Sequence, residues 1–171
     1  METESQSMFF EAETPQASRE LEELRRSADY VPPFAVIRRR VIDDYNDGRM
    51  TIDATVLIRV GGVEEFEAAS GVGALHSLDL VLRKILLKHF PFLDPVRVLE
   101  TYTHATSAST EADVMSVNKF SDGRLNWVTL VKSANTIEAG WQSLVDGYEW
   151  RINYENAKLR RMAANPRIPR R

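Results

Sequence analysis

One order of sequence elements occurs twice in this 171-residue chain, and it is the feature that most constrains the fold. Three strand-like stretches and then a helical stretch fill residues 31–93, and the same order fills residues 94–150. Two copies at a period of about 60 residues are too few and too long for a solenoid. The order therefore predicts an α+β fold of two βββα pseudo-repeats, in which one helix covers one face of each antiparallel sheet. Each half would leave an apolar surface to bury against the other half or against a second chain.

Alternation and turn residues mark the strands. Asn46-Asp47-Gly48 is a strong hairpin signal because these residue types tolerate positive φ. The strand after it, TIDATVLIRV, has a strict two-residue period. This period places one apolar set on a single face, namely Ile52, Ala54, Val56, Ile58 and Val60.

Both helical stretches carry apolar residues at helical spacing. The first follows Gly71-Val72-Gly73 and ends before Pro91. Its stripe is Leu75, Leu78, Leu82, Ile85 and Leu86, and that of the second helix is Ile137, Trp141, Leu144, Val145 and Tyr148. We assign Trp127 and Trp141 to a core or an interface.

Charge separates the two ends from the middle of the chain. Residues 1–28 hold seven acidic and three basic groups, a net charge of −4, and residues 148–171 hold seven basic and two acidic groups, a net charge of +5. We therefore divide the chain into an acidic extension (1–30), a central domain (31–150, with halves 31–93 and 94–150) and a basic, solvated tail (151–171). A short helix capped by Ser18 is expected in residues 15–28.

Several functional classes are disfavoured by composition. The chain has no cysteine, which excludes disulfides and thiolate metal sites, and its three histidines lie far apart. A net charge of −3 gives no reason to expect nucleic acid as a partner. We expect a cytoplasmic protein without membrane contact, metal or cofactor. Asp43 and Asp44 are neighbours on a strand and point to opposite faces, and Arg38-Arg39-Arg40 is interpreted as a strand surface or a protected sheet edge.

Two motifs resemble the C-terminal regulatory domain of the 2-isopropylmalate synthase and citramalate synthase family. In that family the first helix follows Gly-x-Gly-Pro-Val-Asp-Ala and the second follows Ser-Pro-Asn-Ile-Ile-Glu-Ala-Ser-Trp. Here the first motif reads GVGALHS from Gly71, and the second reads SANTIEAGW from Ser133. The second match is close and the first is partial. Together the similar segments cover about residues 34–150 in the same order.

The resemblance implies a dimer of two βββα units with a branched-chain amino acid bound near the helix starts. In full-length synthases this domain follows a metal-dependent barrel that condenses an acyl-CoA with a 2-oxo acid, and such a barrel is much longer than this chain. We therefore expect a stand-alone regulatory domain that acts on a separate synthase. Backbone N–H groups at a helix start bind a carboxylate. The implied effector-binding residues are Gly71, Gly73, Ala74, Leu75, His76, Tyr102, Asn135, Ile137 and Glu138.

Other interpretations of these residues stay open. Gly71 and Gly73 would also suit a tight turn, and Asn135 with Glu138 would suit a capping box. Ala74 and His76 replace the family's Pro and Asp, which favours a different effector, an anionic one or none. No catalytic residue is assigned. The alternatives are a small enzyme with His76 as acid or base, and a ligand-free dimerisation scaffold.

Overall fold

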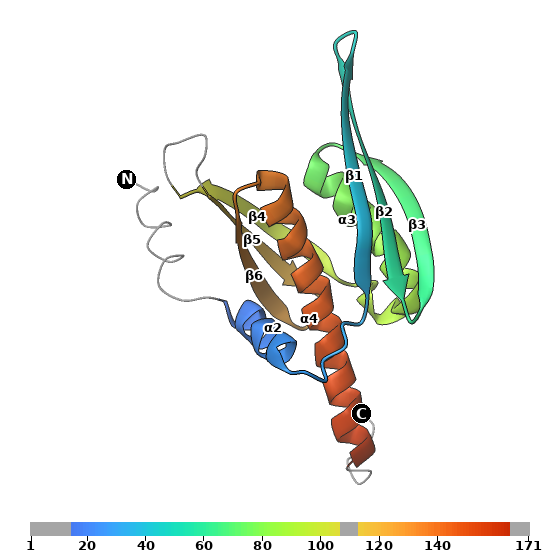
Figure 1. Cartoon of the computed structure of the whole chain (residues 1–171), viewed down its shortest axis with the longest axis vertical. Coiled ribbons are helices and arrows are strands. Elements are labelled where there is room, and N and C mark those ends of the chain that lie inside the picture. The colour runs from blue at the N-terminus through green and yellow to red at the C-terminus, as the bar shows by residue number, and fades with distance from the viewer. Residues whose placement is uncertain (1–14, 107–112, 165–171) are drawn as a thin grey trace. The chain divides into compact units, whose positions relative to one another are not determined.

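The computed structural model describes residues 15–106 and 113–164, and these residues form two compact units. The first-sheet unit comprises residues 31–97 and 148–164. The second-sheet unit comprises residues 15–30, 98–106 and 113–147. Figure 1 shows the elements, and each unit is described by itself.

The first-sheet unit contains an antiparallel sheet of order β1-β2-β3, formed by Ala35–Asn46, Arg49–Val60 and Val63–Gly71. The predicted hairpin turn is present, since Asp47 and Gly48 have φ of 48° and 77°. β1 and β2 pair as far as Asn46↔Arg49, whereas β3 pairs with β2 only as far as Gly71↔Ile52. The β1–β2 hairpin therefore extends beyond β3 (Figure 1).

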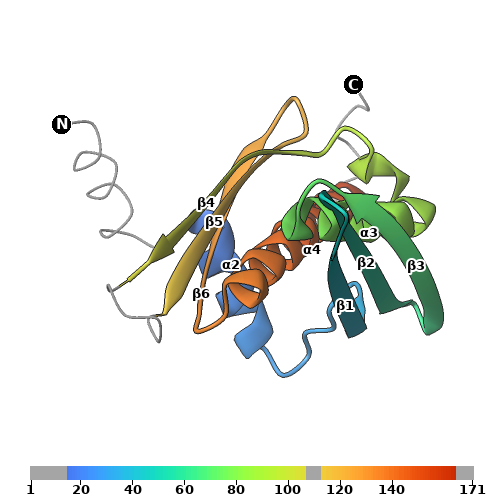
Figure 2. The same cartoon turned by 90° about the horizontal axis from the view of Figure 1, so that it is seen from above.

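Helix α3 (Ala74–His89) packs on β2 and β3, and a short 3-10 turn (Pro91–Leu93) follows it. Figure 2 shows α3 along one face of this sheet. The predicted alternation in β2 is confirmed, because its even-numbered residues from Ile52 to Val60 are buried. Most of the predicted stripe of α3 is also buried, with Leu75 half-buried at its start.

The second-sheet unit repeats this plan. Its sheet has the order β4-β5-β6, formed by Arg97–Ala105, Val114–Ser121 and Asn126–Ser133. Helix α4 (Thr136–Ala164) follows β6. The predicted α+β fold of two βββα pseudo-repeats is thus confirmed. Trp127 and Trp141 are buried, as expected.

Helix α4 continues well past residue 150, where the sequence pattern placed its end. Residues 151–164 contain neither glycine nor proline, and an Arg151–Glu155 pair at 2.9 Å supports this part of the helix. The residues to Gly147 belong to the second-sheet unit and those from Tyr148 to the first-sheet unit.

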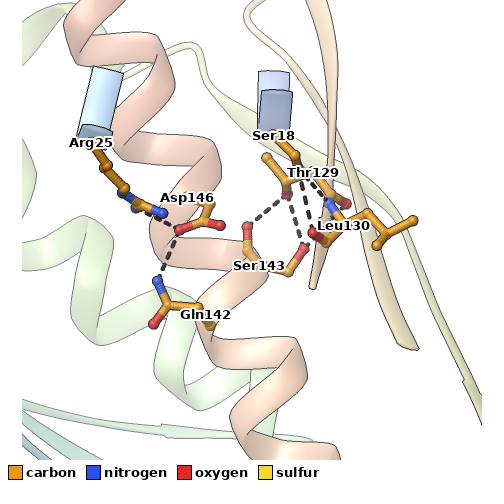
Figure 3. Close-up of polar contacts among 7 residues, drawn as sticks. All are labelled: Ser18, Arg25, Thr129, Leu130, Gln142, Ser143 and Asp146. Atoms are coloured by element: carbon orange, nitrogen blue, oxygen red, sulfur yellow. Dashed lines mark hydrogen bonds and ion pairs between the residues drawn. The ribbon is translucent and has the colours of Figure 1, made fainter. Parts of the chain in front are cut away.

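Helix α2 (Gln16–Arg26) packs against β6, the edge strand of the second sheet. Ser18 does not cap the helix, because Pro15 is at the cap position and Ser18 lies within the first turn. The Ser18 hydroxyl instead accepts the N–H of Leu130 at 2.9 Å and donates to its carbonyl at 3.4 Å (Figure 3). Further along α2, Arg25 pairs with Asp146 of α4 at 2.7 Å. A side chain that was expected to cap a helix therefore satisfies the backbone of a sheet edge.

No helix in residues 15–106 and 113–164 combines the length and apolar character needed to cross a membrane.

Candidate functional site

The junction between β3 and α3 holds five of the nine predicted site residues, and its two glycines have different roles. A Cβ on Gly71 would lie 2.6 Å from the backbone N of Ser77, so this position requires glycine for the close packing of strand on helix. Gly73 has an extended φ of −165°, which any residue adopts, and a Cβ there would meet no atom within 4 Å. Packing therefore explains Gly71, whereas neither packing nor conformation explains Gly73.

The start of α3 carries no side-chain cap. Gly73 is the N-cap residue, and its carbonyl accepts the first helical N–H, that of Ser77, at 2.9 Å. The N–H groups of Ala74, Leu75 and His76 precede this bond and have no acceptor within the helix. The first turn also lacks an acidic side chain. The positive end of the helix dipole and these N–H groups together suit an anion.

His76 is held against the loop before α3. Its Nδ1 accepts the N–H of Val72 at 3.2 Å, which requires the neutral ring with its proton on Nε2. The His76 side chain is exposed, and Val72 is 91% exposed. An exposed imidazole and an exposed apolar side chain therefore flank the uncapped helix start.

Asp79, one turn further along α3, did not emerge from the sequence pattern. The Tyr148 hydroxyl of the same unit donates to Asp79 Oδ1 at 2.7 Å. Burial raises the pKa of Asp79, and the bond from Tyr148 and the nearby Arg83 charge partly offset this rise. The sequence signal that could have identified Asp79 was its position directly after Leu78, a member of the apolar stripe of this helix.

At the start of α4, in the second-sheet unit, Asn135 acts as the helix cap. Its Oδ1 accepts the N–H of Glu138 at 2.9 Å, and its own N–H donates to Ser133 Oγ at 3.1 Å. The capping interpretation is therefore confirmed for Asn135. Ile137 and Glu138 are at least partly exposed in the first turn.

Tyr102 lies on β4, also in the second-sheet unit, within a polar surface cluster. Its hydroxyl donates to Glu100 at 2.5 Å, and Lys119 contacts the same carboxylate at 2.8 Å. The hydrogen bond from Lys119 lowers the pKa of Glu100, and the bond from the Tyr102 hydroxyl adds to this effect. The same bond to Glu100 raises the pKa of Tyr102. Tyr102 alternates along β4 with Thr101, whose hydroxyl bonds Asn118 on the face that meets α4.

The structure thus brings together Gly71, Gly73, Ala74, Leu75 and His76 at one helix start, while Asn135, Ile137 and Glu138 lie at the other and Tyr102 lies on β4. That both helix starts serve one effector stays a prediction. In the described ranges no group of three His, Asp or Glu residues has the arrangement of a metal site.

Two βββα units, each with a motif at its helix start, are the arrangement that the resemblance to the regulatory domain of the 2-isopropylmalate synthase and citramalate synthase family implies. The chain is 31% identical over 154 residues to the (R)-citramalate synthase of Geobacter sulfurreducens, covering 88% of this chain and 29% of that protein. It is 33% identical over 121 residues to the (R)-citramalate synthase of Aquifex aeolicus (70% of this chain, 23% of that protein). The corresponding enzyme of Sulfolobus acidocaldarius is 34% identical over 104 residues (60% and 20%). No protein-family profile matches the chain.

The chain therefore belongs to the citramalate synthase family and corresponds to its C-terminal regulatory domain. It spans less than a third of the length of each of these relatives.

Proposed function

We propose that this regulatory domain binds a small carboxylate effector of the leucine or isoleucine class at the start of α3, forms a homodimer, and modulates a citramalate synthase-type enzyme. The observation that carries the proposal is the uncapped helix start behind Gly73, where a side chain would fit but none is present. Relatives named (R)-citramalate synthase support the link to the condensing enzyme.

The chemistry of the α3 start suits the carboxylate end of such an effector. The N–H groups of Ala74 and Leu75 would bind the carboxylate, and the absence of a side chain at Gly73 allows close approach. Val72 and Leu75 would contact an apolar side chain. The first turn of α3 has no carboxylate that could bind the ammonium group of an amino acid. The 2-oxo acid counterparts of the branched-chain amino acids, which lack this group, are therefore candidates as well.

Titration calorimetry of the full chain against leucine, isoleucine, valine and their 2-oxo acids tests effector binding. We expect heat of binding from at least one compound, and loss of that heat in Gly73→Val with the melting temperature unchanged. The matched control is Ala35→Val, which adds methyl groups at the opposite, exposed end of the same sheet. Absence of binding by all six compounds refutes the effector class, and undiminished binding by Gly73→Val refutes the site.

Modulation is tested with a citramalate synthase whose own regulatory segment has been removed. Adding this chain should change the rate of the condensation, and the effector should alter that change. An unaltered rate at a saturating concentration of the chain would refute the proposed regulation.

A further inference from the structure

Strand β1 is a long and exposed sheet edge. The first sheet has the order β1-β2-β3, so one side of the 12-residue β1 has no neighbouring strand in its sheet. Most of its residues are exposed, and apolar side chains such as Ile37, Ile42 and Tyr45 are among them. An edge of this kind presents unpaired backbone groups that pair with another strand.

The charges along β1 are divided between its two halves. Arg38, Arg39 and Arg40 precede Val41-Ile42, and Asp43 and Asp44 follow. In the part of the chain that the structure describes, no ion pair joins Arg38 or Asp44 to another side chain. A second β1 running antiparallel would place an acidic half opposite each basic half.

Sheet geometry restricts how two such strands align. Residues that face each other across an antiparallel pair have their side chains on the same face of the sheet. The register of β1 is regular from Arg38 to Asn46, so its side chains alternate between faces over this stretch. Two residues of this stretch can therefore pair only if their numbers add to an even sum. Arg38 and Asp44 share a face, because they pair with Leu57 and Thr51 of β2. Arg39 and Asp43 pair with Val56 and Ile52 and share the other face. A twofold axis at Val41 satisfies both sets at once.

This alignment sets Arg38 of one copy opposite Asp44 of the other and Arg39 opposite Asp43, and symmetry repeats each pair. Moving the axis by one residue to Ile42 retains only one type of charge pair, Arg40 with Asp44.

We propose that β1 pairs antiparallel with β1 of a second copy about a twofold axis at Val41, joining two three-stranded sheets into one sheet of six strands. The proposal rests on the homodimer of the proposed function and names the surface that forms it. The partner is a second copy of this chain, because the complementary charges lie on the same strand.

Charge reversal tests this alignment. Arg38→Glu alone and Asp44→Arg alone each place like charges opposite one another at two symmetric positions. We expect each to weaken the dimer about tenfold, measured as the dissociation constant of the full chain by sedimentation equilibrium at low salt. The double variant Arg38→Glu/Asp44→Arg should restore the dissociation constant to about the original value. In this variant opposite charges again face each other at both symmetric positions, with the acidic and basic positions exchanged.

Rescue by the double variant is specific for contact between two copies. Residues 38 and 44 of one strand lie about 20 Å apart, too far for direct interaction within a single chain. Circular dichroism melts of each variant separate loss of the dimer from loss of the fold. The control Arg40→Glu, which would face Ile42 in this alignment, should weaken the dimer less than Arg38→Glu.

Two results overturn the proposal and are distinguishable. Dimers that persist unchanged in both single variants, or a double variant as weak as the sum of the two, would refute this interface while leaving the homodimer in place. A wild-type chain that stays monomeric across the accessible concentrations would refute the homodimer itself.

Discussion

Gly147 of α4 packs against an aromatic ring more closely than any side chain would allow, and Gly147→Ala is the sharpest test of the packing in the second-sheet unit. A Cβ at this position would lie 2.1, 2.3 and 2.8 Å from three ring atoms of Phe120. Ordinary contact distances would require the ring to move by more than about 1 Å. Phe120 is fully buried, so the movement must displace its neighbours.

Those neighbours resist displacement. Trp127 stacks on Phe120 with ring centroids 5.4 Å apart and an interplanar angle of 4°. The Trp127 indole N–H also donates to the Gly147 carbonyl at 3.0 Å, which fixes the second ring to the same helix. Overpacking of this kind costs about 1–3 kcal/mol, whereas alanine gains about 1 kcal/mol over glycine in a helix interior. Because the shortest contact is only 2.1 Å, we take the upper part of this cost, about 2–3 kcal/mol, and expect Gly147→Ala to lower the free energy of unfolding by about 1–2 kcal/mol.

Urea unfolding of the full chain measures this change, and a double-mutant cycle with Phe120→Ala identifies its cause. Once the ring is removed, Gly147→Ala should become neutral or stabilising by up to about 1 kcal/mol, because only the helix propensity remains. A stabilising Gly147→Ala with Phe120 in place, or equal effects in both backgrounds, would show that the close contact does not govern stability here.

Three further changes test other contacts. Glu67 accepts hydrogen bonds from two lysines of α3, and these bonds lower its pKa from 4.5 to about 2. The ionised Glu67 therefore stabilises the fold above pH 4.5, and this stabilisation is lost as the pH falls toward 2. Glu67→Gln should therefore flatten the fall of the urea midpoint between pH 6 and pH 3, and a slope equal to that of the wild type would contradict this assignment. Tyr148→Phe leaves the partly buried Asp79 without its donor, which should cost about 1–3 kcal/mol of unfolding free energy and raise the pKa of Asp79 further in an NMR titration. Ser18→Ala removes the acceptor of the Leu130 N–H, so hydrogen exchange at this amide should accelerate and stability should fall by about 1 kcal/mol, whereas unchanged exchange would mean that α2 does not protect the β6 edge.

Local patterns predicted the local structure well. The two-residue period of β2, the turn at Asp47-Gly48 and the cap at Asn135 each depend on neighbours a few residues apart, and all three are present. Such features follow from backbone preferences that the residues themselves carry.

Contacts between distant segments left no comparable signal. Helix α2 contains few apolar residues, so its sequence does not indicate where it packs. Its Ser18 hydroxyl bonds the backbone of Leu130, which lies 112 positions later in the chain. Sequence also could not separate the two glycines of the candidate site. What distinguishes them is the distance from a hypothetical Cβ to Ser77, a quantity that exists only after strand and helix have packed.

The continuity of α4 across the boundary at residues 147 and 148 affects how this protein can be dissected. The first three turns of α4 belong to the second-sheet unit, and the remaining turns belong to the first-sheet unit. In sequence order, α2 precedes the strands of the first sheet and β4 to β6 follow them, although α2 and β4 to β6 belong to the same unit. No single proteolytic cut therefore releases either sheet with its full complement of helices. A fragment ending near residue 150 would keep both sheets but lose most of the helical segment that α4 supplies to the first-sheet unit, so calorimetry of such a truncation should show that unit melting first.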